Sequence, residues 1–412
     1  MRRTNAFESR LLVLVTLGLV AFGLVMVYSA TSAPAALART DPMSYLKKQG
    51  VYALLGVVLM IAAARFDYRR LRAVAPTLVV SALFLCLAVL AVGTRVNGAR
   101  RWLTFGPATF QPSELAKLAL AVWTAAYLSR RPAPRTLKEL WRPLGMLLCA
   151  FCALVLLEPD LGTAISIVVV VAVILLVSGT PARTLSLGTG LVFAVGLATI
   201  AFSPYRRARL FSFLHPWHDA YGAGFQTVQA MIGLASGGLF GVGLGQGVIK
   251  DNYLPEAHTD MIMAVIGEEL GILGVAAVIA AFAVFAYAGL RIALACKDPF
   301  GKRLAAGLVA LVSGQAVINL AAVLGLAPLT GIPLPFISYG GSSLVVALLS
   351  VGILLNIAGG HVAEGRAAVR DRGRGDGGTR APVARGRGRA RGTRRAGDVR
   401  RVAGSPRGAA RS

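Results

Sequence analysis

Side chains able to exchange protons gather in one short run, immediately before a long apolar stretch. The sequence PEAHTD places Glu256, His258 and Asp260 at two-residue intervals, with the hydroxyl of Thr259 between the last two. A carboxylate at the start of a membrane-depth helix can act as a general base that removes a proton from a hydroxyl group. The same side chains could instead cap the helix by accepting bonds from its free N–H groups. The run is therefore a candidate site of proton transfer, with helix capping as the structural alternative.

A second polar pair lies in QPSELAK, where Glu114 and Lys117 are three residues apart and so share one face of a helix. Pro112 and Ser113, just ahead of them, are typical of a helix start. Ionisable residues at membrane depth are costly, and function is the first explanation to consider for them. A structural ion pair is the alternative interpretation.

Two further carboxylates, Glu158 and Asp160, fall in EPDLGT, a short break between apolar stretches. Pro159 and Gly162 account for the turn, but a turn does not require two acids. These acids could pair with arginines, bind a cation or titrate.

The elements that position these residues must lie in a membrane. Hydrophobic residues make up 56% of the chain and charged residues 15%, against about 45–50% and about 25% in soluble proteins. A soluble core cannot bury so much apolar surface, whereas lipid can. Windows long enough to cross a bilayer core of about 30 Å predict ten spans. These spans are 11–29, 50–64, 74–93, 113–129, 143–157, 163–179, 185–202, 262–290, 305–326 and 342–359.

Backbone groups in lipid must be paired internally, so the spans are helices and the fold class is all-α. Residues 1–10 form a cytoplasmic N-terminus, and 11–360 form a ten-helix membrane domain with an outer loop over about 203–261. Within that loop, 223–235 has the pattern of an amphipathic helix that lies on the membrane interface. Residues 361–412 form a disordered, Arg-rich tail that cannot bury a core.

The distribution of basic residues sets the orientation, because short cytoplasmic loops are enriched in Lys and Arg. With the N-terminus inside, most of the 43 Lys and Arg residues face the cytoplasm, and both termini are cytoplasmic. Attraction to anionic lipid is the simpler role for the tail, and nucleic-acid binding is disfavoured by its place directly after a membrane helix.

Two groups of arginines nonetheless remain on the outer side: Arg95, Arg100 and Arg101 before the fourth span, and Arg206, Arg207 and Arg209 after the seventh. Such arginines could bind the phosphate oxygens of an anionic ligand at the outer leaflet. Snorkelling at the membrane interface is the alternative.

Other patterns carry less chemistry. His215, His218 and Asp219 lack the further ligands that a zinc site needs. The Gly-rich run 237–247 lacks the Lys-Ser/Thr of a phosphate-binding loop, so tight turns explain it better. Cys149 and Cys152 have no second cysteine pair and are expected to pack between helices.

Five segments together resemble the SEDS family of glycosyltransferases, the peptidoglycan polymerases typified by FtsW and RodA. They are NGARRWLTFGPATFQPSELAKLAL (97–120), EPDLGT (158–163), FQTVQAMIGLASGGLFGVGLGQG (225–247), PEAHTDMIMAVIGEELG (255–271) and GIPLPFISYGGSSL (331–344). They occur in the expected order over about residues 10–360. PEAHTD followed by GEELG is more similar to the division-type FtsW branch, since the RodA branch more often has Pro in place of Ala257. HPWHD departs from relatives, which often have acidic or small residues there.

The resemblance implies ten helices and an active site at the outer face of the bacterial cytoplasmic membrane, with use at the division septum. The implied substrate is lipid II, a disaccharide-pentapeptide on undecaprenyl diphosphate, polymerised through β-1,4 linkages with inversion. A divalent cation, Mg or Mn, would assist departure of the diphosphate. The implied partners are a class B penicillin-binding transpeptidase and other division proteins.

Roles also follow from the resemblance, position by position. Asp260 matches the family's essential carboxylate and is the implied catalytic residue. Residues in matching motifs that are implied to bind substrate are Arg101, Trp102, Glu114, Lys117, Asp160, Glu256, His258, Thr259, Ser338 and Ser342.

Three other functions compete with this one. A lipid II flippase would be expected to show internal repeats and a charged site at the membrane midplane, whereas the sequence has no such repeat and its charges collect at one face. A scaffold that activates a transpeptidase, and a RodA-type polymerase of cell elongation, are the remaining alternatives.

Overall fold

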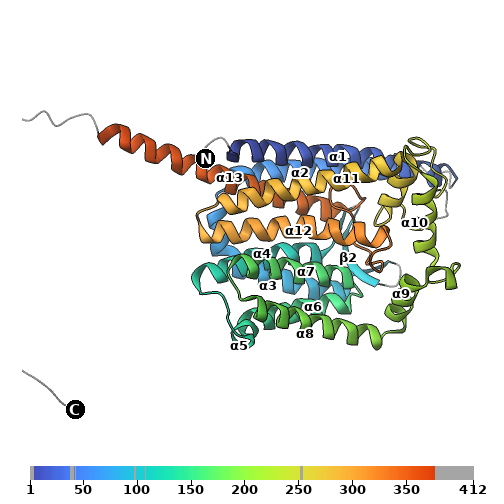
Figure 1. The fold of residues 1–412 in the computed structure, drawn as a ribbon, viewed down its shortest axis with the longest axis horizontal. Helices are drawn as coiled ribbons and strands as arrows, with labels where there is room; N and C mark the ends of the chain where they lie inside the picture. Colours follow the sequence, from blue (N-terminus) through green and yellow to red (C-terminus); the bar gives the residue numbers. More distant parts are fainter. Residues whose placement is uncertain are drawn as a thin grey trace, which may run out of the picture. The chain divides into compact units, whose positions relative to one another are not determined.

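A computed structural model describes residues 4–37, 41, 43–96, 99–106, 108–250 and 254–375 of the 412-residue chain. Helices cover all ten predicted spans and run alongside one another (Figure 1). They are α1 (Thr4–Leu37), α2 (Ser44–Arg65), α3 (Leu71–Val92), α4 (Pro112–Arg130), α6 (Met146–Leu157), α7 (Leu161–Val177), α8 (Ala182–Ala201), α11 (Ile262–Ala295), α12 (Pro299–Val323) and α13 (Gly341–Gly375). The prediction of a helical membrane protein is confirmed.

Eight segments of the described chain are long and apolar enough to cross a membrane. Helix α7 is a shorter apolar helix, and α4 carries Glu114 and Lys117 in its first two turns. The membrane can accept α4 because protein, rather than lipid, surrounds nearly all of it.

The interior of the bundle is built from α4, α12 and α13. In the most apolar stretches of α12 and α13, 72% and 67% of residues are buried, against 6% in α8. Helix α8 therefore presents almost its whole surface to lipid, and its sequence is apolar on all sides for that reason.

Short elements connect the spans. Three of them are the 3-10 turns η1 (Tyr68–Arg70) and η3 (Pro216–Asp219) and the π-helical turn η2 (Trp141–Gly145). The others are α5 (Leu137–Leu140), α9 (Pro204–Leu214) and α10 (Phe225–Ser236). Helix α10 matches the amphipathic helix predicted over 223–235, and α9 and α10 lie at the same end of the bundle as β2 (Figure 1).

A small antiparallel sheet, which the sequence does not predict, precedes α4. It has the order β1 (Thr94–Val96), β2 (Ala99–Phe105) and β3 (Ala108–Phe110). Leu103 pairs with Phe110 and Thr94 pairs with Trp102. The sheet gives the arginines of β2 a fixed direction that an irregular loop would not give them.

Helix α11 is broken at Gly271, whose φ of 66° lies in the left-handed region that favours glycine. Beyond the break, the N–H groups of Ile272 and Leu273 donate to the carbonyls of Gly238 and Leu239. A Cβ added to Gly237 would lie 1.9 Å from the carbonyl oxygen of Gly267, so the two backbones touch. The Gly-rich run thus makes the expected tight turns. Its carbonyls also accept hydrogen bonds from N–H groups that the break in α11 leaves without a partner inside the helix.

Two acids of GEELG bind the residues that follow the Gly-rich run 237–247. The carboxylate of Glu268 accepts from the backbone N–H of Val248 at 2.8 Å. Glu269 forms a buried ion pair with Lys250 at 2.7 Å and accepts from the hydroxyl of Ser29 at 2.7 Å. The segment that leads into PEAHTD is therefore anchored to both α11 and α1.

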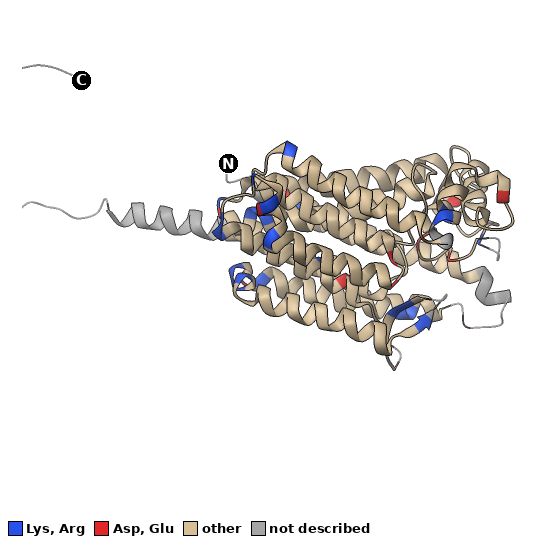
Figure 2. Ribbon diagram, turned by 90° about the horizontal axis from the view of Figure 1, so that it is seen from below, with Lys and Arg blue, Asp and Glu red and all other residues tan. Residues whose placement is uncertain are grey.

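Basic residues gather at the end of the bundle near the N-terminus, and a smaller mixed group of charges lies at the other end (Figure 2). Residues Met1–Arg366 form one compact unit. The helix α13 extends to Gly375, into the segment expected to be a disordered tail, and 376–412 lie outside the described residues.

Candidate active site

Asp260 lies one residue ahead of the N-cap of α11, which is Met261, and its carboxylate does not cap the helix. The carboxylate accepts a bond from the hydroxyl of Thr259 at 3.2 Å. Burial, and then the charge of Glu256, raise the pKa of Asp260 to about 6, with Arg209 acting in the opposite direction. Of the two interpretations of this carboxylate, a group available for proton transfer is therefore the one favoured by its contacts.

The main chain of Asp260 is held by Asn319, which projects from α12. Its amide nitrogen donates to the carbonyl of Asp260 at 2.7 Å and to that of Ile332 at 2.8 Å. Both partners are acceptors, so the amide must face them with its nitrogen. Asn319 is buried, and it thus ties the catalytic candidate to the rigid centre of the bundle.

Glu256 and Thr259 form a turn around this carboxylate. The Thr259 hydroxyl lies 3.1 Å from a carboxylate oxygen of Glu256 as well as 3.2 Å from Asp260. Glu256 has a left-handed backbone, with φ of 59°, which is uncommon for a residue with a side chain. The turn therefore brings two carboxylates to one hydroxyl at the exposed edge of the bundle.

His258 packs among aromatic rings. Its ring centroid is 4.8 Å from that of Tyr45 and 5.5 Å from that of Tyr339. Burial lowers the pKa of His258, against the influence of the Glu256 charge, and so favours the neutral ring. Its carbonyl accepts from the N–H of Tyr339 at 2.9 Å, which joins PEAHTD to the loop between α12 and α13.

That loop carries Ser338, and the start of α13 just after it carries Ser342; each serine has a structural contact. The hydroxyl of Ser338 accepts from the N–H of Leu334 at 2.8 Å, within the buried turn. Ser342, at the start of α13, accepts from the N–H of Gln111 at 3.0 Å. Ser342 thus connects the loop to the residue that immediately precedes α4.

Asp160 is the N-cap of α7. Its carboxylate accepts from the N–H of Thr163 at 3.0 Å, from the Thr163 hydroxyl at 2.8 Å and from Gln111 at 3.3 Å. A Cβ added to Gly162 would lie 2.5 Å from the side chain of Ile332. EPDLGT is therefore packed directly against the same loop, with Asp160 in a capping role.

The two adjacent arginines of β2 cap the ends of helices. Arg100 donates to the carbonyls of Leu90 and Ala91 at the end of α3, at 3.1 Å each. Arg101 donates to the carbonyl of Glu158 at 2.9 Å and to that of Pro159, just past the end of α6. Cations suit these positions because free carbonyls and the helix dipole are both negative there. Two of the five guanidinium N–H groups of Arg101 are used in this way, and the others remain for a ligand.

Glu114 and Lys117 form a buried ion pair at 2.8 Å on α4, and neither side chain is more than 3% exposed. The second carboxylate oxygen of Glu114 has no partner, nor has the amide nitrogen of Gln315 on α12, the helix packed against α4. The predicted structural pairing is therefore real, and it leaves polar atoms free within the bundle.

Most of the predicted residues fall into three groups. The loop over 324–340 contacts the first two of them. Glu256, His258, Thr259 and Asp260 form one group, and Asp160, Ser342 and the residues around Gln111 form the second. Glu114 and Lys117 form the third group, on α4, which begins directly after Gln111. Trp102 is half-buried on β2 and has no contact with Asp260 among the described bonds.

Sequence reasoning missed Asn319, Tyr45 and Tyr339. An amide in the apolar helix α12 could have been noticed as a polar residue at membrane depth. The two tyrosines offer no such signal, because tyrosine is common at membrane interfaces.

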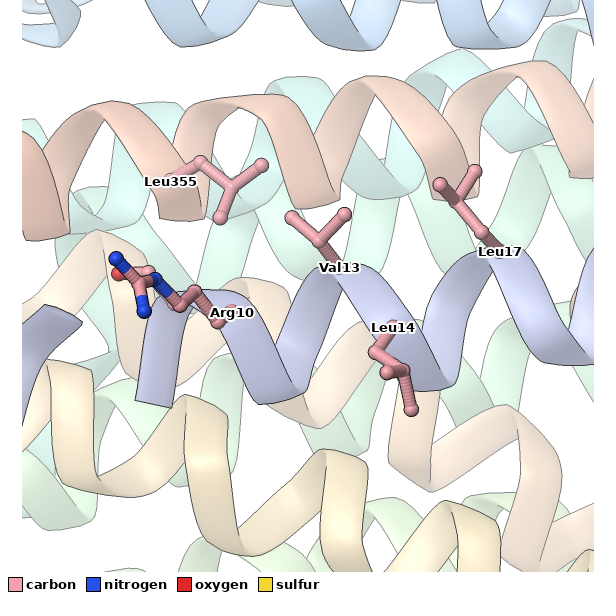
Figure 3. Close-up of a pocket in the computed structure, with 6 residues that line it drawn as sticks. Arg10, Val13, Leu14, Leu17 and Leu355 are labelled. Carbon is pink, nitrogen blue, oxygen red and sulfur yellow. The ribbon is translucent and has the colours of Figure 1, made fainter. Parts of the chain in front are cut away.

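The described residues hold no cluster of three or more His, Cys, Asp and Glu side chains suited to a metal. A hollow of about 580 Å³ lies between α1 and α13, lined by Arg10, Val13, Leu14, Leu17, Leu355 and Ser9 (Figure 3). It contains none of the predicted site residues, and its lining is almost wholly apolar, as suits a surface that faces lipid.

A bundle of apolar helices with polar residues gathered at one end defines a polytopic membrane protein. Residues 9–361 match the cell cycle protein family of FtsW, RodA and SpoVE, and the chain belongs to that family.

Relatives and solved structures agree with this assignment. A protein of Geobacter sp. (strain M18), called a probable peptidoglycan glycosyltransferase FtsW, is 41% identical over 87% of this chain and 98% of its own. Stage V sporulation protein E of Bacillus subtilis is 41% identical over 84% of this chain and 96% of its own.

Among solved structures, RodA of Thermus thermophilus matches with a TM-score of 0.62 and 31% identity, over 84% of this chain and 95% of its own. A chain from a study of polymerization and crosslinking by a peptidoglycan synthase complex matches with a TM-score of 0.70 and 32% identity, over 84% of this chain and 96% of its own.

Proposed function

We propose that this chain is an inverting peptidoglycan glycosyltransferase that polymerises lipid II into β-1,4-linked glycan strands. The carboxylate of Asp260 is the observation that carries the proposal, since Asn319 holds its backbone and nothing uses it as a helix cap. Its raised pKa, about 6, keeps it ionised at neutral pH and basic enough to accept a proton.

In the proposed reaction, Asp260 takes the proton from the hydroxyl of the acceptor sugar. The acceptor oxygen bonds to the anomeric carbon of the donor while the bond from that carbon to the diphosphate breaks, with inversion. The released lipid diphosphate stays in the bilayer, which gives a polymerase reason to be a membrane protein.

The leaving diphosphate needs positive charge near it. The unused N–H groups of Arg101 and the guanidinium of Arg209, which acts on Asp260, can supply such charge. A divalent cation, Mg or Mn, also fits, because Glu256 and Asp260 share one hydroxyl and Mg²⁺ is commonly held by one or two carboxylates together with substrate phosphates. When bound there, the cation would stabilise charge on the leaving group.

We further propose that the polar site faces outward from the bacterial cytoplasmic membrane, with both termini in the cytoplasm. The concentration of basic residues at the opposite end of the bundle supports this orientation (Figure 2). The Arg-rich residues 376–412, outside the described part of the chain, would bind anionic lipid of the inner leaflet.

The proposed partners are a class B penicillin-binding transpeptidase and other division proteins. Support comes from the likeness to a chain of a peptidoglycan synthase complex. Use at the division septum is favoured over cell elongation by relatives called FtsW and by Ala257, which lies within PEAHTD.

The test uses purified protein with labelled lipid II, comparing wild type with Asp260→Ala and Asp260→Asn. Asp219→Asn is a matched control, since Asp219 is an exposed acid of the same outer loop. Polymer is expected from wild type and the control, and none from either Asp260 variant. Equal polymer from all four proteins would refute the role of Asp260. Transport of lipid II without polymer would instead identify a transporter.

A further inference from the structure

Glu158 is a buried acid for which the proposed reaction has no use. The residue is fully buried, and neither carboxyl oxygen has a hydrogen-bond partner. A buried carboxylate without a partner is strongly disfavoured, whereas the neutral acid is far less costly there. Burial, followed by the charge of Asp160, raises the pKa of Glu158 to about 8, against the influence of Arg101.

The neighbours of Glu158 explain why it stays neutral. Arg101 is the nearest cation, yet it donates to the backbone carbonyls of Glu158 and Pro159 and forms no ion pair with the Glu158 carboxyl. The other titratable groups that act on or respond to Glu158 are Asp160 and Cys86. Val155, whose carbonyl accepts from the N–H of Glu158, belongs with Cys86 to a buried apolar cluster built from α3, α4, α6 and α7.

The placement of Arg101 therefore depends on the charge of Glu158. A carboxylate competes for a guanidinium better than a carbonyl does, because the carboxylate carries a full negative charge and attracts the cation more strongly at low dielectric. If Glu158 ionised, Arg101 would exchange its carbonyl partners for the carboxylate and lose the orientation set by β2 and the end of α6.

We propose that Glu158, in its uncharged form, is a positioning residue that leaves the guanidinium of Arg101 directed by the two backbone carbonyls and available to the diphosphate of the substrate. Ionisation of Glu158 withdraws Arg101 from that role. The effect of Glu158 on polymerisation rests on the proposed function. The protonation of Glu158, by contrast, can be observed without any reaction.

The first experiment measures polymerisation of labelled lipid II between pH 7 and pH 9 by wild type, Glu158→Gln and Asp41→Asn. Wild type is expected to lose activity above pH 8, approaching about tenfold per pH unit as one group ionises. Glu158→Gln, which is isosteric and always neutral, should keep its neutral-pH activity and change less than about twofold over the range. Asp41, an exposed acid paired with Lys47, is the control and should leave the wild-type profile intact.

If Glu158 had a purely structural role, its replacement would change stability and leave the pH profile unchanged. The proposal is therefore overturned if Glu158→Gln loses activity above pH 8 as wild type does.

The second experiment is an infrared pH titration of wild type without substrate. It should show a carboxylic-acid C=O band that disappears around pH 8 and is missing from Glu158→Gln. Absence of any such band in wild type overturns the proposal, even if the variant does not fold. Wild-type protein that makes no polymer yet shows the band would refute the proposed function and leave the protonation of Glu158 established.

Discussion

Replacing Asn319 with Leu tests whether a tether from α12 is what makes Asp260 catalytic. The change removes two hydrogen bonds, of 2.7 Å and 2.8 Å, and keeps the size of the side chain nearly constant. It leaves the carbonyls of Asp260 and Ile332 without their donor. An unsatisfied buried carbonyl costs about 1–3 kcal/mol. Ile332 is 2% exposed and should approach the upper value, whereas Asp260 is half-buried and should lie near the lower one.

The expected loss of stability is therefore about 4 kcal/mol, and the expected loss of activity is larger than stability alone explains. A displacement of about 1 Å at a reacting group can cost about 10²-fold in rate. We expect the polymerisation rate of folded Asn319→Leu to fall by about that factor, with a smaller change in KM, because the backbone carrying the base moves and the substrate contacts remain.

Gln315→Leu is the matched control. Gln315 lies one turn earlier on α12, is equally buried, and its amide nitrogen has no partner. Both variants are assayed for thermal unfolding and for polymer formed from labelled lipid II, at a temperature where each is folded. Asn319→Leu with a rate within twofold of Gln315→Leu would show that the tether does not position Asp260.

Two further outcomes follow from the site. Asp260 is the proposed base and its pKa is about 6, so the kcat/KM of polymerisation should rise with pH and level off above about pH 6. A pH–rate profile checks this, and a flat profile from pH 5 to pH 7 would exclude this group as the base. Lys117→Met leaves Glu114 as a buried charge without its partner and should cost about 3–5 kcal/mol. Lys117→Met combined with Glu114→Gln should recover most of the thermal stability. Equal melting temperatures for Lys117→Met and the double variant would contradict a buried ion pair.

The helices could be predicted from the sequence because lipid imposes a simple condition, namely that apolar stretches pair their own backbone groups. Even α4 could be found, although Glu114 and Lys117 lower its hydropathy. The three strands over 94–110 could not, since each is short and its pairing depends on neighbours rather than on its own pattern.

The sequence predicts candidate site residues but not the contacts between them. Asp260 could be singled out by its position ahead of an apolar helix, but its tether to Asn319 joins residues 59 positions apart in sequence. Arg101 could be noticed as a cation on the unexpected side, whereas its use at the end of α6 depends on how β2 packs there. Acids that look alike in sequence also take different roles, since Asp160 caps α7 and Glu158 is left without a partner.

These two acids and Asp260 also bear on the choice between polymerase and transporter. At pH 7 Asp260 is ionised and Glu158 is neutral, because one pKa is about 6 and the other about 8. Carboxyl groups of one protein whose environments push their pKa values apart are typical of acid–base chemistry. A transporter would concentrate its charges near the midplane, between repeated halves. Here Asp260 lies just ahead of α11, Glu158 lies at the end of α6 where Arg101 of β2 contacts its carbonyl, and the charge pair on α4 is buried within the bundle. The arrangement suits a reaction completed at one face, with the helices holding that face in place.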